Sequence, residues 1–288
     1  MLWRSAKYAF DTGEAIVSPI SGASSLSAKA GTDAVTTFFP PRDDWSGLAD
    51  ASGQLGVLLD TEALARFARY RDLLLERSAQ FNLTAIREPE AIERRLFLDA
   101  IALIPELDRV TGDDCLRSDR LIRLVDVGAG AGFPGLALKI VRPSLDVTLV
   151  DATAKKVAFV NEVIAALELE RVRAVQARAE ELGRDSAYRA RFDLATARAV
   201  ASLPVLLEYV IPFLTIGGTA LLPKGLEIAE ELRLGRRAAA ILGAEIVSTG
   251  VLPVGTTRLI VVRKIETTTA AYPRRVGVPS RDPLGEGS

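Results

Sequence analysis

The sequence contains no histidine and only one cysteine, Cys115, among its 288 residues. Without histidine there can be no Ser-His-Asp triad, no Cys-His nucleophile pair and no histidine proton shuttle. The same shortages exclude an ordinary zinc site, because zinc is bound mainly by cysteine and histidine. A single cysteine cannot form an internal disulfide, so nothing indicates an oxidising compartment. If the protein is an enzyme, a cofactor or a positioned substrate must supply the reactivity, and we expect no metal.

Long apolar runs and a charge excess of one sign are also lacking. No run reaches the ~18 apolar residues needed to span a bilayer. Asp11, Gly13 and Glu14 interrupt the N-terminal region before an apolar signal core forms, so we expect a cytoplasmic protein without a membrane segment. The formal net charge of −1 does not favour nonspecific coating of nucleic acid. The 49% apolar fraction allows one main domain with a sizeable core.

Composition divides the chain into four parts. Residues 1–54 have few large apolar side chains and are rich in small polar residues, which predicts a flexible N-terminal extension, unless its aromatic residues cover part of the main domain. Residues 55–115 carry two amphipathic helical patterns and predict a small helical lobe. Residues 116–265 form the main domain, and residues 266–288 form a basic C-terminal tail.

Short apolar segments alternate with helical patterns throughout the main domain. This alternation predicts a mostly parallel sheet with helices on both faces. The expected strands are 121–127, 146–150, 172–176, 192–197, 219–222, 244–251 and 258–264.

A glycine-rich loop follows the first expected strand. Gly128, Gly130, Gly132 and Gly135 come directly after the buried segment Leu124–Val127. Glycine permits positive φ angles and lets a ligand approach the backbone closely. In doubly wound sheets, ligands bind at this end of the strands. Four glycines would be entropically costly in a turn that binds nothing, so we expect a ligand.

Two ligands compete for this loop. The spacing Gly130-x-Gly132-x-x-Gly135 satisfies the dinucleotide fingerprint, which would place a pyrophosphate at the helix N-terminus. Asp126 lies just before the glycines and would repel a pyrophosphate. The same carboxylate would attract the cationic amino-acid end of S-adenosylmethionine, directly or through water. The loop therefore favours S-adenosylmethionine over a dinucleotide.

The next two strands end in residues suited to a nucleoside. Asp151 ends the second strand and could accept hydrogen bonds from both ribose hydroxyls, or alternatively cap the following helix. An acidic residue there excludes a 2′-phosphate but does not separate NAD from S-adenosylmethionine. The third strand leads into Gln176–Glu181, where a backbone amide and an acidic neighbour could read adenine, unless this is a solvated turn.

The residues after the fourth strand argue against one class of target atom. Methyltransferases that act on exocyclic amines usually carry an acidic residue or Asn followed by Pro-Pro and an aromatic residue at this position. The sequence instead continues from Ala197 through Arg198 to Leu203, so an exocyclic amine is not the expected target.

Several phrases together are similar to one known family. The sequence resembles the RsmG (GidB) family, which methylates guanine N7 in small-subunit ribosomal RNA. The resemblance covers about residues 56–284 and implies a Rossmann-like class I methyltransferase of the α/β class, with a mostly parallel seven-stranded sheet preceded by the helical lobe. The sequence motifs that carry this resemblance are Phe81–Pro89, Gly132–Gly135, Ala197–Val200, Lys224-Gly225 and Tyr272–Pro279.

The resemblance implies roles for individual residues. Gly128 and Phe133 would line the donor pocket, and Ala179 with Glu180 would lie on its adenine side. Arg198 matches the family's arginine beside the donor. The full expected set for S-adenosylmethionine is Asp126, Gly128, Gly130, Gly132, Phe133, Asp151, Ala152, Thr153, Ala179, Glu180 and Arg198.

The sequence departs from the family in two places. Leu96–Ile101 stands where the family often has a histidine before an Asp-Ser-Leu phrase. The tail reads Ser280-Arg281-Asp282, where the family is usually rich in lysine. Both departures concern RNA contacts more than cofactor binding.

Methylation at guanine N7 suits a protein without histidine. N7 carries a lone pair and no proton, so in-line displacement needs no general base and depends on positioning. We expect Arg198 and Lys224 to orient guanine O6 or a nearby phosphate, with surface salt bridges as the alternative. We expect Arg274, Arg275 and Arg281 to contact RNA phosphates, unless the tail is disordered.

The expected partner is 16S ribosomal RNA or the small ribosomal subunit, and we expect a monomer. Two other functions stay open. An NAD-dependent oxidoreductase would bind its cofactor through the spacing Gly130-x-Gly132-x-x-Gly135, but it would need a proton donor, and the sequence has no histidine. A non-catalytic RNA- or ribosome-binding protein could keep the methyltransferase fold.

Overall fold

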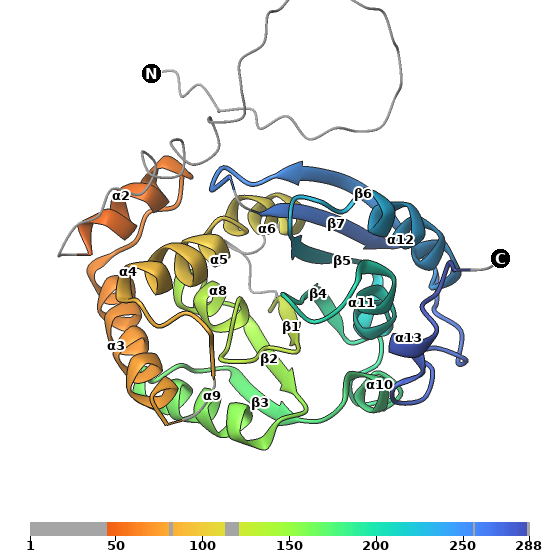
Figure 1. Cartoon of the computed structure of the whole chain (residues 1–288), viewed down its shortest axis with the longest axis horizontal. Coiled ribbons are helices and arrows are strands. Elements are labelled where there is room, and N and C mark those ends of the chain that lie inside the picture. The colour runs from red at the N-terminus through yellow and green to blue at the C-terminus, as the bar shows by residue number, and fades with distance from the viewer. Residues whose placement is uncertain (1–44, 81–82, 113–120, 256, 287–288) are drawn as a thin grey trace, which may run out of the picture.

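The computed structural model describes residues 45–80, 83–112, 121–255 and 257–286. Figure 1 shows a twisted sheet with helices on both sides and the helical lobe at one end. The expectations for the first 44 residues, for Phe81-Asn82 and for Cys115 lie outside the described residues.

The sheet has seven strands in the order β3-β2-β1-β4-β5-β7-β6, which confirms the fold expected from the sequence. Neighbours from β3 through β5 pair in parallel, and β7 runs antiparallel to both β5 and β6. The strands are β1 Arg123–Val127, β2 Asp146–Asp151, β3 Val172–Gln176, β4 Phe192–Thr196, β5 Leu214–Lys224, β6 Ala244–Val251 and β7 Arg258–Lys264.

β5 begins earlier than the sequence predicted, at Leu214 instead of Thr219. Leu214 pairs with Phe192, and the register then shifts so that Thr219 pairs with Leu194. The irregular stretch includes Gly217, whose φ of +85° is accessible to glycine. Because turn residues lie inside β5, the hydrophobic pattern of the sequence did not predict the first half of this strand.

The helical lobe is confirmed, with two differences. Residues Ser46–Gln54 form a helix, α2, where the sequence predicted a flexible extension, because Leu48 and Ala51 are buried against the lobe. The second expected helix is divided by the π-helix η1. The remaining lobe helices are α3 Thr61–Ser78, α4 Pro89–Ile92, η1 Glu93–Leu98, α5 Asp99–Ile101 and α6 Ile104–Thr111.

Two hydrophobic clusters cover the two faces of the sheet. Successive strand residues point to opposite faces, so Leu124 contributes to one cluster and Val125 to the other. The lobe, α8 (Gly135–Val141) and α9 (Ala154–Ala166) cover the first face. The second face is covered by α10 Ala179–Leu182, α11 Leu203–Val210, η2 Ile211–Phe213 and α12 Ala229–Ile241, and the short α13 Val278–Arg281 packs on α11.

This arrangement places the loops that follow β1, β2, β3 and β4 at one edge of the sheet. β1 is followed by α8 on one face, whereas its neighbour β4 is followed by α11 on the other. Such a switch point leaves a crevice at the carboxyl ends of the strands. In the described part of the chain, no helix combines the length and the apolar character that crossing a membrane requires.

Candidate functional site

The loop after β1 forms the centre of the site. The Gly128 and Ala129 N–H groups donate to the carbonyl oxygen of Val150, at 2.7 and 3.0 Å. Gly128 has a φ of +69°, and a Cβ atom on it would lie 2.6 Å from Val200 Cγ2. The loop and the segment after β4 can therefore touch only because position 128 has no side chain.

Asp151 ends β2 and connects two loops. Its Oδ2 accepts a hydrogen bond from the Gly130 N–H at 3.0 Å, and its Oδ1 accepts one from the Thr153 N–H at 2.8 Å. Lys156 Nζ lies 3.8 Å from Oδ2. Each carboxylate oxygen has two lone pairs, so Asp151 keeps acceptor capacity for a ligand.

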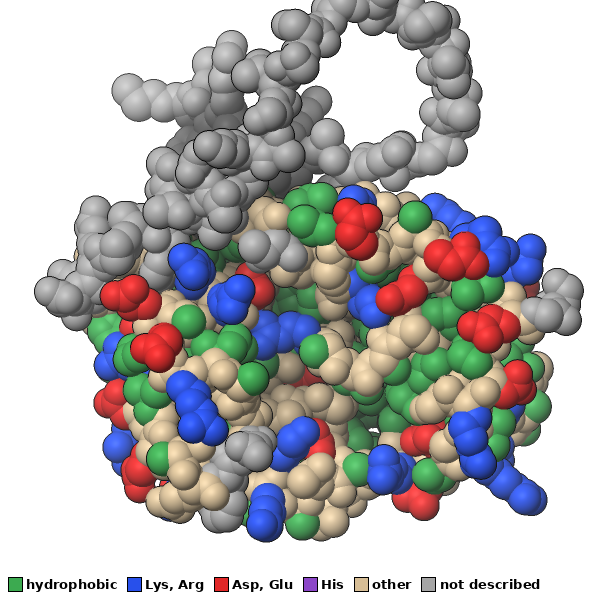
Figure 2. Space-filling model, in the orientation of Figure 1, with side chains coloured by type: hydrophobic (Ala, Val, Ile, Leu, Met, Phe, Trp, Pro, Cys, Tyr) green, Lys and Arg blue, Asp and Glu red, His purple; other side chains and the backbone are tan. Residues whose placement is uncertain are grey.

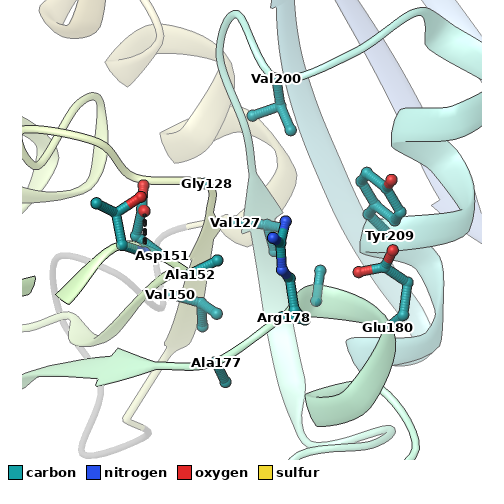
Figure 3. Close-up of a pocket in the computed structure, with 12 residues that line it drawn as sticks. Val127, Gly128, Val150, Asp151, Ala152, Ala177, Arg178, Glu180, Val200 and Tyr209 are labelled. Carbon is teal, nitrogen blue, oxygen red and sulfur yellow. Dashed lines mark hydrogen bonds between the residues drawn. The ribbon is translucent and has the colours of Figure 1, made fainter. Parts of the chain in front are cut away.

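These loops border a cavity, named the main cavity, at the carboxyl ends of the strands (Figure 3). Gly128, Asp151, Ala152, Thr153, Ala179 and Glu180, which the sequence predicted to bind a cofactor, all line it. Its other lining residues are Val127, Val150, Ala177, Arg178, Val200 and Tyr209.

The main cavity has polar groups on two opposite sides. Figure 3 shows Asp151 on one side and Glu180 with Tyr209 on the other. Glu180 is buried, and burial raises the pKa of the Tyr209 hydroxyl. Sequence reasoning missed Tyr209, because it lies on an apolar helix whose pattern indicates only core packing. No sequence signal marks it.

Five residues predicted to bind the cofactor do not line the main cavity, namely Asp126, Gly130, Gly132, Phe133 and Arg198. Asp126 is fully buried, its Oδ2 accepts from the Gly135 N–H at 2.8 Å, and burial raises its pKa to about 7. A direct contact between Asp126 and a ligand is therefore not available in this structure, and its carboxylate fixes the loop instead. A Cβ on Gly132 would collide with Leu136 and Tyr70. The Phe133 ring stacks on Tyr70 at 5.1 Å.

A second cavity, named the side cavity, adjoins the segment after β4. It is lined by Arg198, Ala199, Pro223, Lys224, Gly225 and Thr257. Ala199 has a φ of +56°, a strained value for a residue with a side chain. Since Val200 lines the main cavity and Arg198 lines the side cavity, the three residues 198–200 border both.

The two predicted catalytic residues share the side cavity but have protein partners. Arg198 Nη1 donates to the Arg95 carbonyl oxygen at 3.0 Å, and its guanidinium carbon lies 5.6 Å from the centre of the Phe133 ring. Lys224 Nζ donates to the Ala201 carbonyl oxygen at 2.9 Å and pairs with Glu231 at 2.7 Å. Both cations are therefore held in place.

Asp99 is a residue that sequence reasoning noted only as part of a departure from the family. Its Oδ2 lies 3.9 Å from Arg198 Nη1 and 3.4 Å from the Thr257 hydroxyl. Burial raises the pKa of Asp99 to about 6, although Arg198 opposes this shift. Asp99 follows the π-helix, an element often found at functional sites.

The C-terminal arginines do not form one basic tail. Arg274 binds the buried carboxylate of Glu208, at 2.8 Å, and also pairs with Asp282. Arg274 thus has carboxylate partners within the protein, and its RNA contact stays a prediction. Arg275 and Arg281 are exposed. Figure 2 shows basic side chains around the hollow in the middle of one face.

The site therefore offers hydrogen-bond acceptors, apolar walls and fixed cations. Within the described ranges, no three His, Cys, Asp or Glu side chains are grouped so that they could hold a metal ion. The arrangement can bind a nucleoside in the main cavity and orient a polar or anionic group in the side cavity.

Comparisons with known proteins agree with this geometry. The GidB family, described as rRNA small subunit methyltransferase G, matches residues 63–260. A ribosomal RNA small subunit methyltransferase G from Acetivibrio thermocellus is 42% identical over 82% of this chain and 95% of its own. Proteins of the same name from Desulfitobacterium hafniense and Roseiflexus castenholzii are each 42% identical over 80% of this chain, covering 93% and 95% of their own lengths.

Proposed function

The chain belongs to the rRNA small subunit methyltransferase G (GidB) family, and from that premise we propose that it transfers a methyl group from S-adenosylmethionine to guanine N7 in 16S ribosomal RNA. The family match over residues 63–260 carries this proposal. An NAD-dependent oxidoreductase is not favoured, because the relatives are methyltransferases in name and the sequence has no histidine to donate a proton.

The residues of the main cavity fit S-adenosylmethionine. Asp151 has acceptor capacity for ribose hydroxyls, and Glu180 could accept from the adenine amino group. Val150, Ala177 and Val200 supply apolar surface for the base. Gly128 leaves the backbone open where a side chain would collide with Val200. This combination supports a nucleoside ligand with a free ribose.

The reaction needs alignment more than proton transfer. When bound, S-adenosylmethionine supplies a methyl group that is attached to a positively charged sulfur. The leaving group is the neutral thioether that remains after the methyl group is transferred. Guanine N7 attacks with its own lone pair, so no side chain has to remove a proton. The protein's contribution is to hold the base and the donor in line, an effect that can lower the barrier by roughly 7–11 kcal/mol.

Arg198 and Lys224 are our candidates for orienting the target guanine. Their charges border the side cavity, and protein contacts restrict their movement. Arg198 can donate to guanine O6, and Lys224 can contact O6 or a nearby phosphate. Arg275 and Arg281 are exposed and stay candidates for RNA phosphates.

We propose 16S ribosomal RNA, free or within the small subunit, as the partner. We also propose that the protein acts as a monomer in the cytoplasm, where small subunits are made and used.

Tritiated-methyl transfer to unmodified 16S ribosomal RNA, naked and within the small subunit, tests this function. We expect label in at least one substrate and none when the protein is omitted. Borohydride and aniline cleave RNA at N7-methylguanine, so primer extension should then stop at a single guanine. Label that resists this cleavage would contradict N7 as the target, and absence of label in both substrates would contradict the activity.

A further inference from the structure

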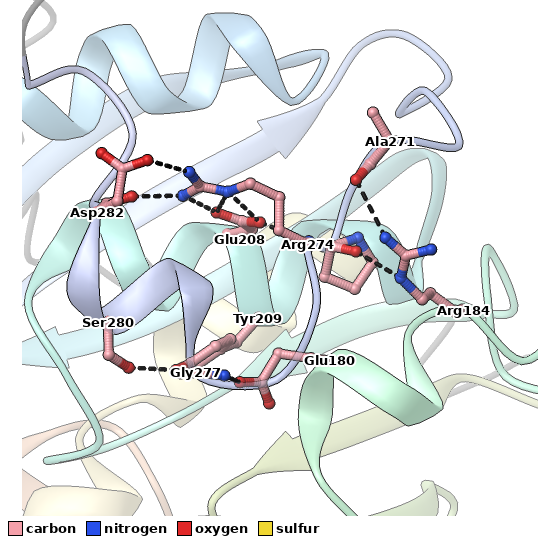
Figure 4. Close-up of polar contacts among 10 residues, drawn as sticks. Glu180, Arg184, Glu208, Tyr209, Ala271, Arg274, Gly277, Ser280 and Asp282 are labelled. Carbon is pink, nitrogen blue, oxygen red and sulfur yellow. Dashed lines mark hydrogen bonds and ion pairs between the residues drawn. The ribbon is translucent and has the colours of Figure 1, made fainter.

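The C-terminal segment, residues 266–286, packs against the two helices that border one side of the main cavity (Figure 4). Arg184, which follows α10, donates from Nε to the Pro273 carbonyl oxygen at 2.7 Å. Leu284 is buried in the core beside α11 and α12.

The strongest anchor of this segment is the pair between Arg274 and Glu208. Glu208 belongs to α11 and has no exposed surface. Its Oε1 accepts from the Arg274 backbone N–H at 2.7 Å, and its Oε2 accepts from Nη2 at 2.8 Å. A buried carboxylate needs such a partner, because removing one member of a buried pair leaves an uncompensated buried charge. Asp282 binds the outer side of the same guanidinium.

The segment also contacts two side chains that line the main cavity. Tyr209, next to Glu208 in the chain, has its hydroxyl 2.8 Å from Ser280 Oγ. Glu180 Oε1 accepts from the Gly277 N–H at 3.1 Å. Figure 4 shows both contacts on the same side of α13. Two polar groups of the cavity are thus held by a part of the chain that does not itself line it.

We propose that the C-terminal segment positions the adenine half of the donor site, with Arg274 as its anchor and Gly277 and Ser280 as its contacts. This inference rests on the proposed function, because it assumes that the adenine of S-adenosylmethionine lies beside Glu180 and Tyr209. The Gly277 N–H fixes one oxygen of Glu180 and leaves acceptor capacity on the carboxylate for the adenine amino group. Ser280 fixes the tilt of the Tyr209 ring beside the base.

The neighbouring arginines Arg274 and Arg275 make the proposal testable. Both carry the same charge, but Arg274 binds Glu208 and Arg275 is exposed. We would measure the affinity of the full chain for the donor S-adenosylmethionine by calorimetry without RNA, in R274A, R275A and the control R236A, which alters an exposed position on α12. We expect R274A to weaken donor binding at least about tenfold. A loss of this size is expected when one hydrogen bond to a charged group, here the Glu180 carboxylate, is misplaced. R275A and R236A should stay within about twofold, since exposed charges contribute little.

Two further measurements separate positioning from general damage. R274A should raise KM for the donor while kcat at saturating donor stays within about threefold, because the methyl end of the site is unchanged. It should also lose the preference for adenosine over purine riboside, which lacks the 6-amino group. S280A removes one hydrogen bond and should fold normally, so it keeps the proposal testable if R274A unfolds; we expect about fivefold weaker donor binding.

Unchanged donor affinity in folded R274A, or in S280A if R274A does not fold, would overturn the proposal. An equal loss in R274A and R275A would also overturn it, because the arginines would then act through charge alone. The binding measurements use no RNA, so they remain decisive even if methyl transfer to ribosomal RNA is not observed. A wild-type chain that binds no donor would overturn this proposal and the proposed function together.

Discussion

Arg198 and Asp99 lie 3.9 Å apart, and their pairing joins the loop after β4 to the helical lobe. Arg198 borders the side cavity, whereas Asp99 comes from the junction of η1 and α5. The ion pair, together with the bond from Arg198 to the Arg95 carbonyl oxygen, sets where this guanidinium points. The lobe is therefore part of the site and not an independent appendage.

We expect the D99A variant to lose methyl transfer while keeping its affinity for the donor. Without Asp99, Arg198 lacks its nearest carboxylate and its guanidinium can shift, and a small misplacement can cost about 100-fold in rate. Single-turnover methylation and donor calorimetry would measure the two effects. E245Q, at an exposed position of β6, is the control. Full activity of D99A would show that Asp99 does not position Arg198.

Two glycines of the β1 loop should respond differently to alanine. Both have positive φ, so each substitution should cost about 1–2 kcal/mol of stability. A Cβ at position 128 would also lie 2.6 Å from Val200, whereas at position 130 the nearest atom is 3.9 Å away. We expect G128A to weaken donor binding at least about tenfold more than G130A. Thermal unfolding and calorimetry would measure both; equal losses of affinity would contradict the close approach of Val200.

Asp151 should matter to donor binding through both of its oxygens. D151A removes the acceptors for the Gly130 and Thr153 N–H groups and for the ribose. We expect donor affinity to fall about 100-fold, corresponding to two lost hydrogen bonds to a charged group. K156A is the matched control, since Lys156 lies 3.8 Å from the same carboxylate, and it should change affinity less than about threefold. The proposed ribose contact would be wrong if D151A bound the donor normally.

The buried carboxyl of Asp126 should make stability depend on pH. Burial raises its pKa from 3.8 to about 7, so the folded state holds a proton that the unfolded state has lost between these values. Folding stability should therefore fall as pH rises from about 4 to about 7, and the contribution should level off above 7. D126N can keep the hydrogen bond from the Gly135 N–H and has no carboxyl to titrate.

Urea unfolding of the wild type and D126N at pH 5, 6, 7 and 8 would test this. We expect the stability of D126N relative to the wild type to increase with pH up to about 7. If the difference in unfolding free energy between D126N and the wild type does not vary with pH, Asp126 does not titrate in this range.

The sequence by itself determined the sheet, the order of its elements and the position of the glycine-rich loop after β1. Apolar strands and amphipathic helices of suitable length leave few arrangements, because parallel strands require right-handed crossovers. The same local logic placed Gly128, Asp151 and Glu180 together, since the carboxyl ends of adjacent parallel strands meet at one edge. These were predictable because each depends on a few consecutive residues.

Only the tertiary structure decided what each polar side chain faces. Asp126 precedes the glycines and suggested a ligand contact, but it points into the core, where burial leaves it to bind Gly135. Arg274 and Arg275 are the same residue type at neighbouring positions, but Arg274 binds the buried carboxylate of Glu208 whereas Arg275 is exposed. Such partners come from distant parts of the chain. Burial and long-range pairing depend on how the elements pack, and no local pattern records them.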